Sequence, residues 1–440
     1  MLEKIKNKLN GEVHFKDLLK GSAITFVLKI SGIGSSYVLI YLIAKRLGAE
    51  GVGFFQVMLQ ILTILGMVLG LGMNISVLRY VGQFNNEENR PKMHALYKYF
   101  LQTVAPLSFC VGILLYFGAN YIVHWIGKDE EYAEGLKLIG IVLPFFTINQ
   151  ISVEFIRGLK KLQISELVRS VLSPLVMILG ISVLFRQIQT KVDIIYLLVF
   201  SLIINSMVSR WAIWKTLKKV TKNTFGFERK EFMKTSYPML LTAVCSSLLA
   251  AMPFFFLDYY TTQADVGVYS VAFRLALIPS LVLKVINIIA APKFSELYWA
   301  EKMQELQKLI TQSTKLMFWA ALGLVIIIVF FGKYLLQVFG EKFQEGYLVL
   351  LILSLGQLVN AATGSVGVVM NMSGKQKDLR RVITILTVIG FCSYLTLGTW
   401  FKVSYFYIAI VSAVIDAVLN IYLSSLVFKK YKIKTYYIPL

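Results

Sequence analysis

Residues 49–55 read AEGVGFF, and a version of the same stretch that is one residue shorter, ADVGVY, stands at residues 264–269. Two further matches keep this order along the chain: WIG at 125–127 with VFG at 338–340, and GLK at 158–160 with GK at 374–375. Self-similarity at one nearly fixed offset indicates a duplicated chain. In membrane proteins, related halves of this kind enclose a transport site between them. We therefore expect a transporter built from two similar halves.

The composition places this duplicated chain in a membrane. Hydrophobic residues make up 57% of the 440 positions and charged residues only 16%, whereas soluble domains are about 45–50% apolar and about 25% charged. The stretches 51–78, 99–127 and 346–374 contain no charged residue, and about 20 helical residues cross a hydrocarbon core of roughly 30 Å. Continuous apolar runs, as opposed to alternating ones, indicate helices and not a barrel. The expected fold class is an all-α polytopic membrane protein.

The apolar runs predict twelve transmembrane helices in two pseudo-symmetric six-helix lobes. The predicted spans are 21–44, 52–82, 97–123, 138–156, 165–186, 193–214, 235–259, 266–292, 314–335, 346–372, 382–401 and 403–428. The N-terminal lobe, residues 1–214, begins with a basic stretch at 1–20 of the kind that lies at a membrane interface. A basic cytoplasmic tether at 215–234 leads to the C-terminal lobe, residues 235–440, which ends in a basic tail.

The positive charges predict the orientation. With both termini cytoplasmic, and with charges at span ends counted with the adjoining segment, 33 of the 45 lysines and arginines fall on cytoplasmic segments, 9 on outward loops and 3 well inside spans, as the positive-inside rule requires. The net charge of +21 is spread over seven short cytoplasmic segments, which favours attraction to anionic membrane lipids over binding of nucleic acid. The expected location is the cell inner membrane or plasma membrane.

No cofactor or metal is expected. The three cysteines lie inside predicted spans without CxxC pairing, and the three histidines have no metal-ligand spacing, so the cysteines are interpreted as packing residues. The chain also lacks a GxxxxGK[ST] phosphate-binding loop, which argues against direct use of ATP.

Four ionisable residues stand well inside predicted spans: Lys29, Arg274, Lys284 and Asp416. Each costs about 2.5–3.5 kcal/mol on insertion scales, and such residues therefore usually face a cavity or a partner. Polar residues share a face with the charges. In span one this face has Thr25, Lys29, Gly32 and Ser36, and in span two it has Gln56, Gln60, Thr63, Gly70 and Asn74. When Gly53 is aligned with Gly267, Gln60 corresponds to Arg274.

These residues suggest a water-filled cavity whose cations hold an anionic ligand, because Lys and Arg bind phosphate groups in this way. The candidate substrate-binding residues are Lys29, Arg274, Lys284, Gln60 and Asn74. The alternative is that small and polar residues make helix contacts while the lysines snorkel to an interface. Asp416 is interpreted as a buried counter-ion or structural hydrogen-bond partner, with ion coupling as the alternative.

Four short stretches then carry a family resemblance: LLKGS at 18–22, LGAEGVG at 47–53, LGLG at 69–72 and RYV at 79–81. They resemble the oligosaccharide flippase family, the O-antigen and capsule repeat-unit translocases of the multidrug/oligosaccharidyl-lipid/polysaccharide exporter superfamily. The resemblance implies alternating access and a polyprenyl-pyrophosphate-linked oligosaccharide as cargo for cell-surface polysaccharide or lipopolysaccharide biosynthesis. It also implies other polysaccharide assembly proteins as partners.

Two departures from related families are informative. Lipid II flippases usually have fourteen spans, so twelve favour the repeat-unit branch. Ion-coupled drug extruders typically carry a carboxylate in span one or seven, and here those spans have none before Asp258 at the outer edge.

Two other functions stay open. A cation-coupled drug or metabolite exporter would be favoured if Asp416 bound a cation. A membrane polymerase, ligase or glycosyltransferase would need acidic or basic groups over the outer leaflet, commonly on a long loop. The richest outward segment, 128–137, carries four acidic residues but is short, and it is interpreted as a solvated surface loop. The chain is therefore not expected to be an enzyme.

Overall fold

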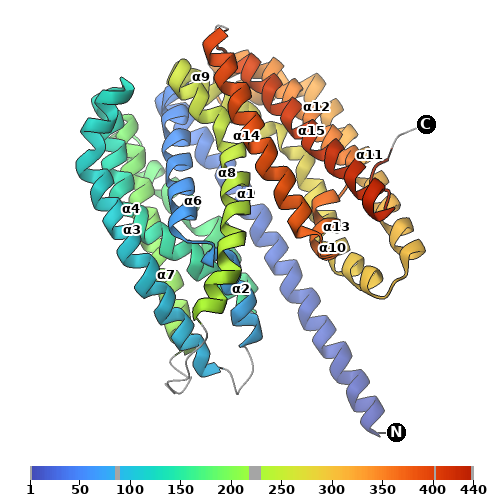
Figure 1. Ribbon diagram of the computed structural model, residues 1–440. Helices are drawn as coiled ribbons and strands as arrows, with labels where there is room; N and C mark the ends of the chain where they lie inside the picture. The colour runs from blue at the N-terminus through green and yellow to red at the C-terminus, as the bar shows by residue number, and fades with distance from the viewer. Residues whose placement is uncertain (1, 85–89, 218–228, 401–402, 438–440) are drawn as a thin grey trace. The chain divides into compact units, whose positions relative to one another are not determined.

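The computed structural model describes residues 2–84, 90–217, 229–400 and 403–437, and within these ranges every regular element is a helix. The chain divides into two compact units (Figure 1). Unit 1 comprises residues 1–46 and 58–244, and unit 2 comprises residues 47–57 and 245–440. In the described ranges, ten helices are long and apolar enough to cross a membrane, and a bent helix pair makes eleven. The chain is thus an all-helical, multi-pass membrane protein.

Unit 1 is built from the first helices of the chain. They are α1 (Leu2–Leu69), α2 (Met73–Gln83), α3 (Arg90–Ile126), α4 (Glu130–Gly158), α5 (Leu162–Glu166), the π-helix η1 (Leu167–Val171), α6 (Leu172–Val183), α7 (Lys191–Leu217) and α8 (Arg229–Tyr260), of which residues 245–260 belong to unit 2. The unit packs around one apolar cluster, with Val77 from α2, Phe100 from α3, Phe155 from α4 and Ile213 from α7.

The helix α1 joins two spans that the sequence predicts separately, 21–44 and 52–82. The helix is interrupted at Gly48, whose backbone angles (φ 67°, ψ −161°) are not helical. Glycine reaches a positive φ without the steric cost that a Cβ imposes, so the chain bends here without an intervening loop. The predicted interfacial stretch 1–20 is the beginning of α1 from Leu2 onward and not a separate helix, although its side chains lie outside the described residues.

The second predicted span also ends differently. The helix α1 stops at Leu69, and α2 begins at Met73 after a tight turn with Leu71 and Gly72 at positive φ. A Cβ at Gly72 would lie 2.2 Å from the Ser236 carbonyl oxygen of α8, so only glycine allows this turn to pack so closely. The turn is held further by Ser76 and Ser236, whose hydroxyl oxygens are 2.6 Å apart.

The α3–α4 hairpin corrects the prediction of a solvated loop at 128–137. Only residues 127–129 connect the two helices, and α4 begins at Glu130. The Asp129 carboxylate caps the helix by accepting a hydrogen bond of 3.0 Å from the Tyr132 amide. Glu130 and Glu131 occupy the first turn, where negative charge is favourable. These capping signals outweigh the high density of charge, and the predicted loop is two turns of helix.

The two helices of this hairpin touch through their backbones. A Cβ on Gly112 of α3 would lie 2.4 Å from the Gly140 carbonyl oxygen of α4, and a Cβ on Gly140 would lie 2.6 Å from the Gly112 oxygen. Small residues at a crossing point allow membrane helices to approach this closely. Figure 1 shows α3 and α4 side by side along their length.

An exposed apolar stripe on α3 is typical of a surface that contacts lipid. Phe117, Tyr121 and Trp125 recur every four residues and are 79%, 78% and 82% exposed. A row of large apolar side chains on the outside of a unit is costly in water and favourable in a bilayer. The aromatic residues near the end of the helix suit the headgroup level.

Unit 2 contains the remaining helices. They are α9 (Gln263–Ala276), α10 (Ile278–Trp299), α11 (Met303–Gln337), the 3-10 helix η2 (Glu341–Gly346), α12 (Tyr347–Thr363), α13 (Val366–Met372), α14 (Gln376–Trp400) and α15 (Tyr405–Tyr431). An apolar cluster fills the unit, with Phe294 from α10, Ile310 from α11, Met370 from α13 and Val427 from α15.

The predicted tether 215–234 is described only at its ends. The helix α7 finishes at Leu217 and α8 begins at Arg229, so Lys218, Lys219 and Lys222 lie outside the described residues.

Candidate functional site

The best-defined polar contact in unit 2 lies where residues 47–57 of α1 cross α9. A Cβ at Gly53 would lie 1.9 Å from the Gln263 carbonyl oxygen, and a Cβ at Gly267 would lie 2.0 Å from the Ala49 oxygen. If Gly53 is paired with Gly267 and no gap is introduced, Ala49 pairs with Gln263, the residue just before Ala264. The two contacts are therefore equivalent: Gly53 packs on Gln263 and Gly267 packs on Ala49, as happens when two copies meet around a two-fold axis. The duplicated stretch crosses its own copy here.

Three polar side chains meet one turn beyond this crossing. The Arg274 Nη2 donates a hydrogen bond of 2.8 Å to Gln56 Oε1, and the Ser270 hydroxyl donates one of 3.4 Å to the same oxygen. Gln56 and Ser270 are equivalent in the repeat alignment. Both are buried, and Gln56 is 5% exposed. Gln56 therefore fixes the direction of the Arg274 side chain.

Arg274 lies in the last turn of α9, just before the helix breaks. A capping box between Thr262 and Asp265 fixes the start of α9. The bend of 42° between α9 and α10 falls at Leu277, and Pro279 stands in the first turn of α10. A cation at a helix C-terminus is favourable. The hydrogen bond from Arg274 to the neutral Gln56 side chain orients this half-buried guanidinium.

Lys29 lies in unit 1 on the predicted polar face of α1 and is half-buried. Its ammonium makes no hydrogen bond or ion pair within the described part of the chain. Gly32 on the same face packs against η1, since a Cβ there would lie 2.6 Å from the Ser170 Cβ. This face therefore serves helix packing at Gly32 and carries an unneutralised cation one turn earlier.

The other three substrate-binding candidates differ in exposure. Gln60 and Asn74 belong to unit 1 and are half-buried. The Asn74 Oδ1 is buried and accepts no hydrogen bond from any side chain or backbone group that the structure describes. Lys284 in unit 2 is exposed on α10.

Asp416 lines a cavity of about 200 Å³ inside unit 2, together with Phe273, Tyr394 and Ser412. The Ser412 hydroxyl lies 2.8 Å from the Tyr394 hydroxyl and 3.1 Å from that of Tyr269. The Asp416 carboxylate takes no part in this network, and no lysine or arginine in the described ranges forms an ion pair with it. The interpretation of Asp416 as a counter-ion thus finds no partner among these residues.

The predicted residues are distributed over both units, and Gln56 is the one that sequence reasoning left out of the site. Lys29, Gln60 and Asn74 fall in unit 1, whereas Arg274, Lys284 and Asp416 fall in unit 2. The signal for Gln56 was its place on the predicted polar face of span two, four positions before Gln60. Among the described residues, no group of three or more His, Cys, Asp or Glu side chains could hold a metal ion.

Three comparisons relate this geometry to known proteins. The model of the family described as polysaccharide biosynthesis protein matches residues 18–298. A Shigella flexneri protein named as an O-antigen transporter is 25% identical over 356 residues, which cover 78% of this chain and 80% of that protein. A Haloferax volcanii protein named as the low-salt glycan biosynthesis flippase Agl15 is 24% identical over 340 residues, or 77% of this chain and 68% of that protein.

A solved structure shares the fold. An inward-facing multidrug resistance MATE family transporter of the MOP superfamily superimposes with a TM-score of 0.77 at 13% identity. The match covers 93% of this chain and 98% of that one. At this identity the likeness establishes the fold alone.

Proposed function

The chain belongs to the polysaccharide biosynthesis protein family, a family of membrane transporters and not of enzymes, and we propose that it is a flippase for polyprenyl-pyrophosphate-linked oligosaccharide repeat units. The cargo would move by alternating access from the inner to the outer leaflet and feed cell-surface polysaccharide biosynthesis. The resemblance found in the sequence is confirmed at the level of the family.

The observation that carries the proposal is Arg274, held in position by a neutral partner. A guanidinium donates parallel hydrogen bonds to phosphate oxygens in a fixed fork. Gln56 orients the arginine, and as a neutral amide it does not itself compete with such a ligand in the way a carboxylate partner would. Lys29 and Lys284 would add positive charge, and Gln60 and Asn74 would add neutral hydrogen-bonding groups.

The helix count supports twelve spans. The apolar part of α1, Ile24–Leu69, has 46 residues, or about 69 Å of helix at 1.5 Å per residue, which is more than twice a hydrocarbon core of roughly 30 Å. Because it is interrupted at Gly48, α1 would supply two of the proposed spans. If the bent pair α9 and α10 is counted as one more, the total would be the twelve spans that we propose, in two lobes at 1–214 and 235–440. The charge distribution favours both termini in the cytoplasm of an inner or plasma membrane.

The membrane potential would favour transport in this direction. When a negative charge moves outward across an inside-negative membrane, its electrostatic free energy falls by about 2.3 kcal/mol per 100 mV. A pyrophosphate-linked cargo would therefore be driven outward without hydrolysis of a nucleotide.

The proposal is tested by reconstituting the protein in liposomes that contain a lipid-linked oligosaccharide. Accessibility of the sugar to an external lectin or glycosidase would be followed with and without an imposed potential. We expect translocation that depends on the protein and becomes faster when the potential is negative on the side from which the cargo leaves. Liposomes with protein that expose sugar no faster than protein-free liposomes would refute the flippase.

Changing Gln56 to glutamate tests whether the charge of Arg274 is used. Glutamate has nearly the same shape as glutamine and keeps the acceptor oxygen, but its charge would pair with the guanidinium. We expect translocation to fall by about tenfold, because a cation engaged by a carboxylate loses about 1.4 kcal/mol or more of attraction for the pyrophosphate. The measurement is the liposome assay. If Arg274 serves only to hold the helices together, Gln56→Glu would strengthen that contact and leave transport unchanged.

The cation-coupled exporter remains a second candidate because Asp416 lies in a cavity without a described partner. A carboxylate in such a place either binds a cation or is protonated. If Asp416 couples transport to a cation, Asp416→Asn will abolish acceleration by a pH or sodium gradient but preserve slow exchange without a gradient. The measurement is translocation with and without each gradient. An equal response to both gradients in the variant and the parent would exclude coupling at Asp416.

A further inference from the structure

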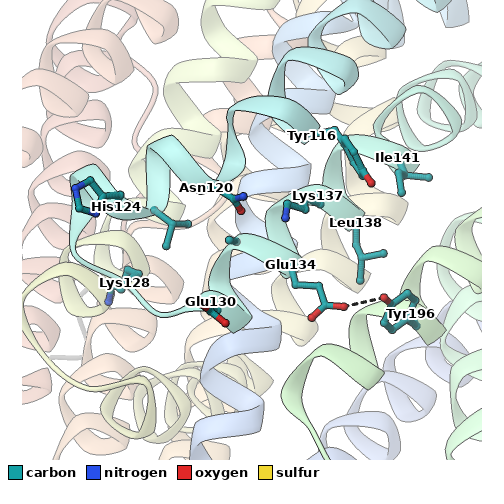
Figure 2. A pocket seen from close by; sticks show the side chains of 12 residues that line it. Tyr116, Asn120, His124, Lys128, Glu130, Glu134, Lys137, Leu138, Ile141 and Tyr196 are labelled. Carbon is teal, nitrogen blue, oxygen red and sulfur yellow. Dashed lines mark hydrogen bonds between the residues drawn. The ribbon is translucent and has the colours of Figure 1, made fainter.

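A second pocket, of about 750 Å³, lies in unit 1 at the end of the α3–α4 hairpin, and its lining includes none of the candidate substrate-binding residues. Its walls come from three helices and from Lys128 in the connection between α3 and α4 (Figure 2). The helix α3 contributes Tyr116, Asn120 and His124, and α7 contributes Tyr196. The helix α4 contributes one face, with residues 130, 134, 137, 138 and 141. Residues 130, 134 and 137 of this face belong to the segment 128–137 that the sequence predicts as a solvated loop.

The glycine crossing of α3 and α4 lies beside residues that line this pocket. Gly112 and Gly140 bring the two backbones into contact. Tyr116 on α3 follows Gly112 by one turn, and Ile141 on α4 directly follows Gly140. Both side chains line the pocket. The shape of the pocket is therefore set largely by the helices of this hairpin.

Charged, aromatic and aliphatic side chains line the pocket together. Figure 2 shows His124 and Lys128 at one end and Tyr116 and Ile141 at the other. Two lysines, Lys128 and Lys137, and two glutamates, Glu130 and Glu134, line it, so charges of both signs are balanced.

The charged side chains of the pocket differ in the contacts that they make with neighbouring residues. The Tyr196 hydroxyl donates a hydrogen bond of 2.8 Å to Glu134, and Lys128 lies 5.6 Å from the centre of the Tyr132 ring. The half-buried Lys137 ammonium has no hydrogen-bond or ion-pair partner within the described ranges. Lys137 is therefore the cation best placed to receive an external anion.

The level of the pocket along α3 matches the edge of a bilayer. Tyr121 and Trp125 of the exposed apolar stripe lie on the same turns of α3 as Asn120 and His124. Aromatic side chains of this kind settle among lipid headgroups. On α4 the lining passes within three turns from Glu130 to Ile141, that is, over about 16 Å at 1.5 Å per residue. This distance is enough to run from headgroup level to the first carbons of an acyl chain.

We propose that this pocket binds a phospholipid whose headgroup carries both a phosphate and a primary ammonium, as in phosphatidylethanolamine. The phosphate contacts Lys137 and Lys128, the ammonium donates hydrogen bonds to Glu134 and Glu130, and one acyl chain follows Leu138 and Ile141. An anionic lipid would satisfy the lysines but face two carboxylates. A choline headgroup has no N–H to donate to them. The site needs only that the protein spans a membrane and is independent of the cargo proposed above.

The test is lipid binding by the purified full-length protein, measured by native mass spectrometry during titration with phosphatidylethanolamine, phosphatidylcholine or phosphatidylglycerol of identical chains. We expect tighter binding of the ethanolamine lipid than of the other two. Lys137→Gln is expected to weaken binding of the ethanolamine lipid by about tenfold, as the loss of one charged hydrogen bond does. Lys98→Gln, on the same helix as Asn120 but at its other end, removes the same charge and serves as the control.

Glu134→Gln separates the two halves of the headgroup. Glutamine keeps an acceptor for Tyr196 but loses the charge that attracts the ammonium. We therefore expect weaker binding of phosphatidylethanolamine and unchanged or tighter binding of phosphatidylglycerol. Equal affinity of the parent for all three lipids, or a preference for the anionic one, would overturn the proposal. So would parental affinity in both Lys137→Gln and Glu134→Gln. Because no transport is measured, failure here leaves the flippase proposal untouched.

Discussion

Arg274→Ala is expected to reduce translocation of lipid-linked oligosaccharide by about ten- to a hundredfold while the protein remains folded in the membrane. A charged hydrogen bond to a phosphate contributes about 1.5–3 kcal/mol, and each 1.4 kcal/mol is a factor of ten. Arg274 is half-buried and already oriented by Gln56, so little conformational entropy is lost when it binds its ligand. The measurement is the initial rate of sugar exposure in liposomes at matched protein content.

Two further variants make this result interpretable. Arg274→Lys keeps the charge but loses the fork of donors, and its rate should fall between those of the parent and Arg274→Ala. Arg381→Ala removes a guanidinium from an exposed position on α14 and should transport like the parent. Parental transport by Arg274→Ala would remove the anion-binding site from this position, and the proposed mechanism would lose its main contact.

Gly53→Ala and Gly267→Ala are expected to cause the largest losses of stability. The added methyl groups would lie 1.9 Å and 2.0 Å from backbone carbonyl oxygens, far inside normal contact distances of 3.5–4.0 Å. Relief would require residues 47–57 and α9 to move apart. We expect a loss of about 3 kcal/mol for each, at the upper end of ordinary overpacking. The measurement is the apparent melting temperature of the purified protein in detergent.

The matched control is Gly323→Ala in α11 of the same unit. A Cβ at Gly323 meets no heavy atom within 4 Å, and alanine favours helix over glycine, so its melting temperature should equal or slightly exceed the parent's. Parental stability of both Gly53→Ala and Gly267→Ala would mean that the two segments do not cross as described.

The sequence alone was sufficient to establish the helical membrane fold. Long uncharged stretches such as 346–374 are too apolar to be exposed to water as loops. In lipid, a helix is the structure that satisfies the hydrogen bonds of their backbones. A charged residue inside a membrane span can also be recognised from the sequence, because the free energy of inserting Arg274 depends on the apolar residues that flank it. The family also followed from short stretches such as 47–53. The loop predicted at 128–137 is wrong because the capping pattern that starts at Asp129 stabilises a helix from Glu130 onward.

Only the tertiary structure decided which partners these residues have. Gln56 and Arg274 are separated by 218 positions, and nothing in either neighbourhood specifies their contact. It depends on the glycine crossing of two repeated helices, where fractions of an ångström decide the approach. The same holds for the cavity beside Asp416 and for the pocket shared by α3, α4 and α7. Hydrophobicity and charge are properties of a segment and can be read along the chain, whereas an interhelical contact is a property of packing and exists only once the helices are assembled.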